Sequence, residues 1–134
     1  MVGNAVGVSG FHHVAVIASD YAASKAFYAD ALGFEILDEN FRAERDSWKL
    51  DLALPGGGQI ELFSFPTPPA RPSRPEACGL RHLCFAVADV AATKAALEAR
   101  GVAVEDIRVD PYTGRAFTFA ADPDGLPLEF YESA

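Results

Sequence analysis

Short runs of apolar residues, each bounded by glycine, proline or aspartate, divide the first half of this chain into predictable elements. The apolar, β-branched segment 11–18 predicts a strand, and Asp20 can cap a helix over 21–32. Gly33 follows where a helix commonly ends in the left-handed conformation. The first half is therefore predicted to be a βαβββ unit, with its last three strands at 34–38, 47–54 and 59–65.

The same order of elements returns after a proline-rich segment over 66–78, which can form neither a helix nor a central strand. A strand is predicted over 80–87, and Asp89 can cap a helix that runs to Arg100 and ends at Gly101. The second half is thus a second βαβββ unit, with its remaining strands at 102–109, 115–120 and 126–131.

The two halves also match residue by residue, which indicates an internal duplication. Segment 10–26 aligns with 79–95 at an offset of 69, and segment 55–63 aligns with 123–131 at an offset of 68. The matched pairs include His13 with His82, Asp20 with Asp89, and Glu61 with Glu129. We expect an α+β fold in which a single domain, 1–134, pairs two βαβββ modules over about 10–65 and 79–132 through the linker 66–78.

Each half places one histidine near its start and one glutamate near its end, and strand alternation places Glu61 among apolar neighbours on one face. Two carboxylates in an apolar trough lose hydration worth several kcal/mol and repel each other, whereas a divalent cation removes both costs. Nitrogen and oxygen donors without thiolates suit a catalytic ion with open positions. We therefore predict one divalent ion (Ni, Zn, Co, Mn or Fe) bound by His13, Glu61, His82 and Glu129, with His12 facing the other side of its strand.

The net charge of the chain limits the kinds of partner that it can bind. The net charge of −8, from 19 acidic and 11 basic residues, argues against nucleic acid and against an anionic membrane surface. Neither a signal peptide nor a membrane-spanning run is evident, so we expect a cytoplasmic protein with a small-molecule substrate. If the substrate carries an anionic group, the candidate residues to bind it are Arg42, Arg45, Lys49, Arg108 and Arg115.

Several motifs together give a family resemblance over about 11–132: HHVAVIASD, DALGFE, QIELF, GLRHLCFAV and DPDGLPLEFYE. With them the chain resembles the glyoxalase I-like branch of the vicinal oxygen chelate superfamily. The resemblance implies the paired βαβββ fold, usually as a homodimer, with a metal at the centre of a trough. It also implies that the metal ligands are the same four residues that the internal duplication indicates: His13, Glu61, His82 and Glu129.

The resemblance implies a metal-dependent lyase or isomerase that acts on a small oxygen-chelating substrate through an enediolate-type intermediate. Glu129 or Glu61 would move the proton, and the resemblance favours Glu129. Glutathione-dependent relatives carry an arginine and an asparagine where this chain has Ile17 and Phe65, so we do not expect the glutathione hemithioacetal as substrate. The expected substrate contacts are Phe63, Phe65, Ile17 and Arg115.

Two other functions remain open from the sequence. A phenylalanine-lined trough would also suit a metal-assisted binding or resistance protein without turnover, and a dioxygenase is a weaker alternative. The length of the linker permits the trough to form between the halves of one chain or between halves of two chains in a dimer.

Overall fold

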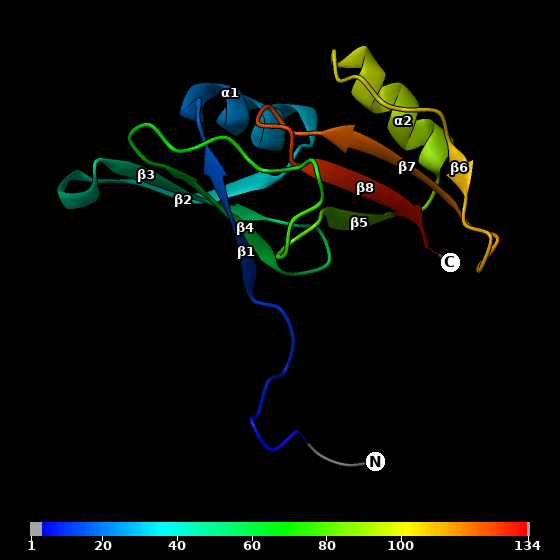
Figure 1. Cartoon of the computed structure of the whole chain (residues 1–134), viewed down its shortest axis with the longest axis horizontal. Helices are drawn as coiled ribbons and strands as arrows, with labels where there is room; N and C mark the ends of the chain where they lie inside the picture. Colours follow the sequence, from blue (N-terminus) through cyan, green and yellow to red (C-terminus); the bar gives the residue numbers. More distant parts are fainter. Residues whose placement is uncertain (1–3, 134) are drawn as a thin grey trace.

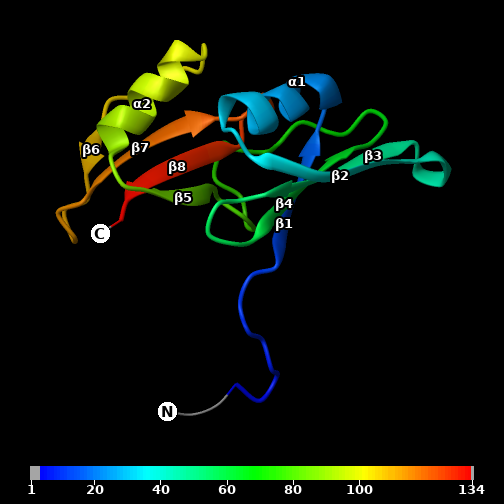
Figure 2. The ribbon, with the colours of Figure 1, turned by 180° about the vertical axis from the view of Figure 1, so that it is seen from behind.

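Two four-stranded mixed sheets lie side by side, and α1 and α2 cover the same side of them (Figure 1). This computed structural model describes residues 4–133; residues 1–3 and 134, the ends of the expected domain, lie outside the described residues. The view from behind shows the same arrangement, with the segment before β1 leading away from the sheets (Figure 2). None of the described helices is both long enough and apolar enough to cross a membrane.

The first module forms one sheet in the order β1-β4-β3-β2. Strand β1 runs parallel to β4, and the other neighbours are antiparallel. Its elements are β1 (His13–Ala18), α1 (Tyr21–Ala26), η1 (Phe27–Ala31), β2 (Glu35–Arg42), η2 (Ala43–Arg45), β3 (Ser47–Ala53) and β4 (Gln59–Ser64).

The second module repeats this plan in the order β5-β8-β7-β6, again with its first strand parallel to its last. Its elements are β5 (Leu83–Val87), α2 (Val90–Ala99), β6 (Arg108–Val109), β7 (Ala116–Ala121) and β8 (Pro127–Glu132). The predicted α+β fold of paired βαβββ units is thereby confirmed.

Both helices begin at the predicted aspartates. The Asp20 carboxylate accepts from the amide of Ala23 at 3.1 Å, and Asp89 accepts from the equivalent amide, that of Ala92, at 3.1 Å. The first helix differs from the expected 21–32 span, because α1 ends at Ala26 and the chain continues as the π-helix η1. Both helical segments face the core, so this widening leaves the sheet packing intact.

One predicted strand is much shorter in the structure. The expected strand over 102–109 is reduced to β6 and an isolated bridge at Val104. The Lys94 ammonium on α2 donates hydrogen bonds to the backbone carbonyls of Val104 at 3.1 Å and Glu105 at 2.8 Å. These carbonyls bond to a side chain instead of extending a strand ladder, which accounts for the shortening.

The core lies between the sheets and the helices, because alternate strand residues turn toward α1, η1 and α2. Its most deeply buried strand residues are aliphatic: Leu50, Leu52, Ile60, Leu62 and Leu128. The intervening residues form the opposite, open face of each sheet, and the predicted metal ligands belong to this face. Packing of the core thus positions the site without filling it.

Candidate metal centre

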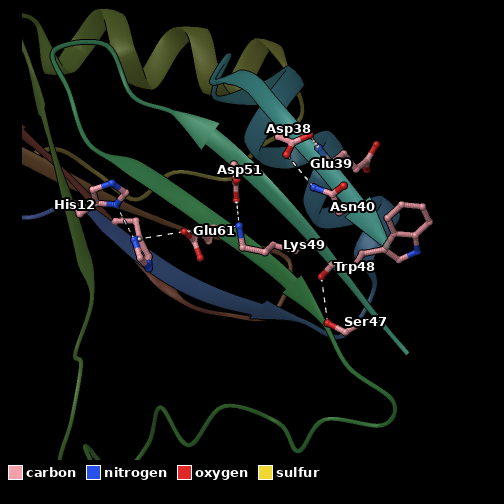
Figure 3. Close-up of polar contacts among 10 residues, drawn as sticks. His12, Asp38, Glu39, Asn40, Ser47, Trp48, Lys49, Asp51 and Glu61 are labelled. Atoms are coloured by element: carbon pink, nitrogen blue, oxygen red, sulfur yellow. Dashed lines mark hydrogen bonds and ion pairs between the residues drawn. The ribbon is translucent and has the colours of Figure 1, made fainter. Parts of the chain in front are cut away.

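Neighbouring parallel strands bring His13 and Glu61 together in the first module. In the β1–β4 register His13 lies opposite Gln59 and Ala15 lies opposite Glu61, so both candidate ligands occupy the open face. The distance from His13 Nδ1 to Glu61 Oε2 is 3.4 Å (Figure 3). The Glu61 side chain is 14% exposed and that of His13 is 38% exposed, which leaves the imidazole accessible beside a largely buried carboxylate.

The second module repeats this pair. His82 directly precedes β5, and Glu129 lies on the adjacent strand β8 opposite Cys84. The distance from His82 Nε2 to Glu129 Oε1 is 3.0 Å, and the Glu129 side chain is again 14% exposed. We call His13 with Glu61 the first half-site and His82 with Glu129 the second half-site.

The two half-sites do not merge within one chain. Among residues 4–133, no three or more His, Cys, Asp or Glu side chains are grouped closely enough to hold a metal ion. The single chain therefore assembles the predicted ligands as two pairs, and the sequence leaves open whether the halves of one chain or of two chains unite all four.

His12 departs from its predicted orientation. Its Nδ1 lies 2.9 Å from Nδ1 of His13, and the two rings meet edge to face. Strand alternation does not fix the side chain of His12 because His12 precedes β1, although its carbonyl accepts from the amide of Gln59 at 3.1 Å. One of the two facing nitrogens must carry the proton and the other must accept it, so His12 can orient the imidazole of the first half-site.

Charged residues surround the first half-site. Lys49 on β3 lies between Asp51 and Glu61, with its Nζ 2.7 Å from Asp51 Oδ1 and 3.9 Å from Glu61 Oε2 (Figure 3). The hydrogen bond to Asp51 is the main cause that raises the pKa of Lys49 above its usual range. Glu61 therefore has a permanent ammonium near one of its oxygens.

Apolar and aromatic groups surround the second half-site. Phe119 on β7 lies opposite Glu129, and its ring centroid is 5.2 Å from that of His82. Loss of hydration, together with the Glu129 carboxylate, raises the pKa of Cys84 to about 12. The thiol of Cys84 is thus protonated at neutral pH and is a poor nucleophile.

The predicted substrate contacts fall in two places. Ile17 lies opposite Phe63 on the open face of the first sheet, and the rings of Phe63 and Phe65 stack with centroids 6.0 Å apart. The Arg42 guanidinium lies 4.9 Å from the Phe63 ring centroid, which adds a cation to this otherwise apolar group. Arg115 instead lies near the end of β8, where its Nη1 donates to the carbonyl of Glu132 at 3.3 Å.

The linker contributes a feature that sequence reasoning missed. Segment 66–78 was expected only to connect the modules, but its residues wall a cavity of about 1110 Å³ that also includes His82 and Arg108. Arginines interspersed among the linker prolines, Arg71 and Arg74, are the signal that could have indicated this role.

Comparisons with known proteins agree with this fold. Residues 10–130 match the family model described as the glyoxalase/bleomycin resistance protein/dioxygenase superfamily. The uncharacterized protein YaeR of Escherichia coli (strain K12) is 64% identical over 127 residues, which cover 95% of this chain and 98% of YaeR. The crystal structure of SMU.1112c has a TM-score of 0.89 and 48% identity, covering 93% of this chain and 99% of that chain. A glyoxalase family protein from Enterococcus faecalis has a TM-score of 0.86 and 51% identity, with coverages of 92% and 97%.

More distant structures have more specific names. Lactoylglutathione lyase from Agrobacterium tumefaciens has a TM-score of 0.69 and 26% identity, covering 95% of this chain and 96% of that chain. TnmS3, an antibiotic binding protein from Streptomyces sp. CB03234, has a TM-score of 0.72 and 27% identity, with coverages of 96% and 98%. Because the family model matches most of the chain, residues 10–130, the chain belongs to the glyoxalase/bleomycin resistance protein/dioxygenase superfamily.

Proposed function

We propose that the protein is a metal-dependent lyase or isomerase whose metal site is completed by two copies of the chain. The observation that carries this proposal is the pair of equivalent half-sites, each with an imidazole nitrogen within 3.4 Å of a largely buried carboxylate. Together they offer the two nitrogen and two oxygen donors of a catalytic metal site.

The arrangement of the sheets favours a homodimer. The two sheets lie side by side with their helices on one side, so the open faces of one chain do not cover each other (Figures 1 and 2). A second copy related by a two-fold axis would place its second half-site against the first half-site of its partner. This pairing yields two equivalent sites for each dimer.

The donors suit a divalent ion. Each glutamate side chain is only 14% exposed, and two such carboxylates would repel each other if they were brought together without a cation. Two carboxylates neutralise one divalent charge, and neutral imidazoles complete the donor set without adding charge. Ni, Zn, Co, Mn and Fe all accept these donors.

When bound, such an ion would polarise adjacent oxygens of a hydroxy-carbonyl substrate and make a neighbouring C–H group more acidic. Glu129 is the better candidate to take that proton. The Lys49 ammonium lies 3.9 Å from Glu61 and helps to hold that carboxylate in place, whereas none of the ion pairs found among residues 4–133 joins Glu129 to a lysine or arginine. We assign Glu129 as the proton-transferring group and Glu61 as the more permanent ligand.

The open face of the first sheet supports a substrate other than the glutathione hemithioacetal. Ile17 and Phe65 stand at the positions where glutathione-dependent relatives carry an arginine and an asparagine, and neither side chain can bond to a carboxylate or an amide. We expect little or no turnover of the hemithioacetal and propose a smaller, oxygen-chelating substrate.

Heterodimers test both the ligand set and the pairing. We expect Glu61→Ala and Glu129→Ala homodimers each to lose bound metal. Chains that carry these two different changes, co-expressed with two tags and purified as heterodimers, would recover one intact site, against two in the wild type. Metal analysis measures this recovery. Full metal content in either parent would overturn the ligand set, and no recovery in the heterodimer would overturn the two-chain site.

A second candidate, a metal-assisted binding protein without turnover, is favoured by the aromatic rings on the second sheet. Phe117 stacks on Tyr131 with centroids 6.2 Å apart, beside Phe119. Such surfaces suit a flat apolar ligand. Recovery of chemically unchanged ligand after prolonged incubation with metal-loaded protein would favour binding alone, whereas an isomerised product would exclude it.

A further inference from the structure

A cleft between the linker and the second sheet collects positive charge beside the second half-site. We call it the linker cleft; it has a volume of about 1110 Å³, slightly above the range of about 300–1,000 Å³ that is usual for small-molecule sites. Its floor includes Phe117 and Phe119, and His82 lies in its wall. Its charged lining residues are Arg71, Arg74, Arg81 and Arg108 against Glu76 and Glu105. The cleft is therefore cationic in a chain whose net charge is −8.

One arginine builds the wall of the linker cleft. Arg71 donates from Nε to the Ser73 hydroxyl at 2.9 Å, and from Nη2 to the carbonyls of Leu80 and Arg81 at 3.0 and 2.9 Å. These bonds tie the linker to the segment that leads directly into His82. The guanidinium of Arg71 thus holds the wall in place and is largely used by the protein itself.

The other arginines retain capacity to bind an anion. Arg74 and Arg81 both approach the single carboxylate of Glu76, at the loose distances of 3.8 and 3.7 Å, and their side chains are 87% and 71% exposed. Two guanidinium groups sharing one distant carboxylate leave most of their N–H donors unpaired. Arg81 is also the residue immediately before His82, so an anion at Arg81 would lie close to the second half-site.

Arg108 approaches from the sheet, and its side chain, 53% exposed, stacks on two aromatic rings. Its guanidinium lies 4.8 Å from the Phe117 ring centroid and 5.4 Å from that of Phe119, and Nη2 bonds to Glu105 at 2.7 Å. Stacking on two rings restricts the side chain, and one carboxylate occupies only part of its planar donor fork. A pre-positioned guanidinium of this kind loses little conformational entropy when it binds an oxyanion.

We propose that the linker cleft binds an anionic group of the substrate, a carboxylate or a phosphate, through Arg81 and Arg108, with Arg74 in support. The assignment of this anion as part of the substrate rests on the proposed function, because only then do the chelating oxygens of the same molecule belong at His82 and Glu129. The rings of Phe117 and Phe119 contact the intervening carbon atoms. The substrate class is thus a small organic acid or phosphate ester with adjacent oxygens.

The test uses the full chain as purified, titrated separately with inorganic phosphate and with acetate at constant chloride concentration. Saturable shifts are expected for the backbone amides of 78–82 and 105–108, followed by nuclear magnetic resonance. Arg81→Gln and Arg108→Gln should each weaken the affinity for the preferred anion about tenfold, because each removes a charge-assisted bond. Arg100→Gln is the matched control, since Arg100 caps the end of α2 outside the cleft and its Nη1 donates to the carbonyl of Ala96.

Preference for phosphate or for acetate identifies the anionic group, and either result supports the proposal. Arg108→Lys should recover part of the affinity, which separates charge from folding; unchanged amide shifts outside the cleft check the fold. Glu129→Ala removes a proposed metal ligand without altering a residue that lines the cleft, so anion binding should survive it. The proposal is overturned if neither anion saturates, if the three arginine-to-glutamine variants bind alike, or if binding is lost only in Glu129→Ala. Metal analysis of Glu129→Ala judges the proposed function separately.

Discussion

On the open face of the first sheet the strand next to Glu61 presents the charged side chains of Lys49 and Asp51, whereas the strand next to Glu129 in the second sheet presents the aromatic rings of Phe117 and Phe119. The strand registers make the comparison direct: Asp51 lies opposite Glu61, and its counterpart Phe119 lies opposite Glu129. Two residues along each strand, and on the same face, Lys49 lies opposite Phe63 and Phe117 lies opposite Tyr131.

The difference shows which features the duplicated backbone retains. Both modules keep a capping aspartate, a His–Glu pair and the same strand order, which serve folding and ligand placement. The residues around each glutamate have diverged. We infer that two equivalent carboxylates have acquired different neighbours and hence different roles.

The largest expected effect separates the two glutamates. We expect Glu129→Gln to lower kcat about a hundredfold or more while metal is retained, because the variant lacks the proton-transferring group. Glu61→Gln should lower kcat by about tenfold or less, because Lys49 holds the Glu61 carboxylate in place as a ligand and Glu129 carries the proton. Turnover per bound metal on a hydroxy-carbonyl substrate is the measurement.

Lys49→Met provides the control for this comparison. It removes the ammonium near Glu61 and should narrow the difference between the two glutamine variants. Equal losses of kcat in Glu129→Gln and Glu61→Gln, with Lys49 intact, would contradict the assignment of separate roles.

A buried hydrogen bond joins the two modules. The buried Tyr28 hydroxyl donates to Asp122 at 2.8 Å, whereas the positions equivalent to these two in the internal alignment are Leu97 and Leu54. Burial, and next the Asp122 carboxylate, raises the pKa of Tyr28 above its usual range, so the hydroxyl remains a donor. Tyr28→Phe leaves Asp122 with one donor fewer and should lower the free energy of unfolding by about 1–3 kcal/mol.

Denaturant unfolding measures this loss. Tyr21→Phe is the matched control, since Tyr21 bonds to Glu39 within the first module and is only partly buried. Its expected loss is at most about 1 kcal/mol. A larger loss for Tyr21→Phe than for Tyr28→Phe would show that the inter-module bond is the weaker of the two.

Local chemistry made much of this fold predictable. Asp20 and Asp89 mark the helix starts, and strand alternation assigns Glu61 and Glu129 to their sheet faces. The widening after Ala26 is not encoded by a local cap, and the short β6 depends on a distant lysine side chain. The π-helix and the short β6 therefore could not be predicted without the tertiary structure.

The candidate site was predictable to a similar extent. Strand periodicity specifies which face a ligand occupies, and each His–Glu pair forms on adjacent parallel strands. Periodicity carries no information on how one sheet faces another. The sequence therefore left open whether one chain or two would bring the half-sites together. It also did not predict that the linker arginines lie near His82.

A smaller effect distinguishes two lysines that are equivalent in the duplication. Lys94 on α2 donates to two backbone carbonyls, whereas Lys25 on α1 donates to the Glu39 carboxylate at 2.8 Å. Lys94→Met leaves part-buried carbonyls without this donor and should lower the free energy of unfolding by about 1 kcal/mol, with most of the loss present at both about pH 7 and about pH 4, because the only partly buried Glu98 pair of Lys94, at 3.7 Å, contributes little. Unfolding at the two pH values measures this, and a loss that disappears at the lower pH would contradict the backbone role.

The smallest effect is the acid sensitivity of the Lys25–Glu39 pair. Hydrogen bonds from Lys25 and then from Tyr21 lower the pKa of Glu39 below its usual value of 4.5. A carboxyl group whose pKa is lower in the folded state stabilises the fold above its unfolded pKa, and this stabilisation is lost as pH falls through the folded value. Because the pair is partly exposed, with side chains 37% and 27% accessible, the contribution should be below about 1 kcal/mol.

Glu39→Gln should therefore be less stable than the wild type at neutral pH, and the difference should shrink as pH falls below about 4.5. Glu98→Gln is the matched control, since the Glu98 carboxylate pairs with Lys94 at the longer distance of 3.7 Å and its side chain is 49% exposed. Unfolding free energies measured across this range should converge for Glu39→Gln and stay parallel for Glu98→Gln. If the Glu39→Gln difference were constant with pH, the charge of Glu39 would not be what stabilises the first module, and the two equivalent lysines would not differ in the way the structure indicates.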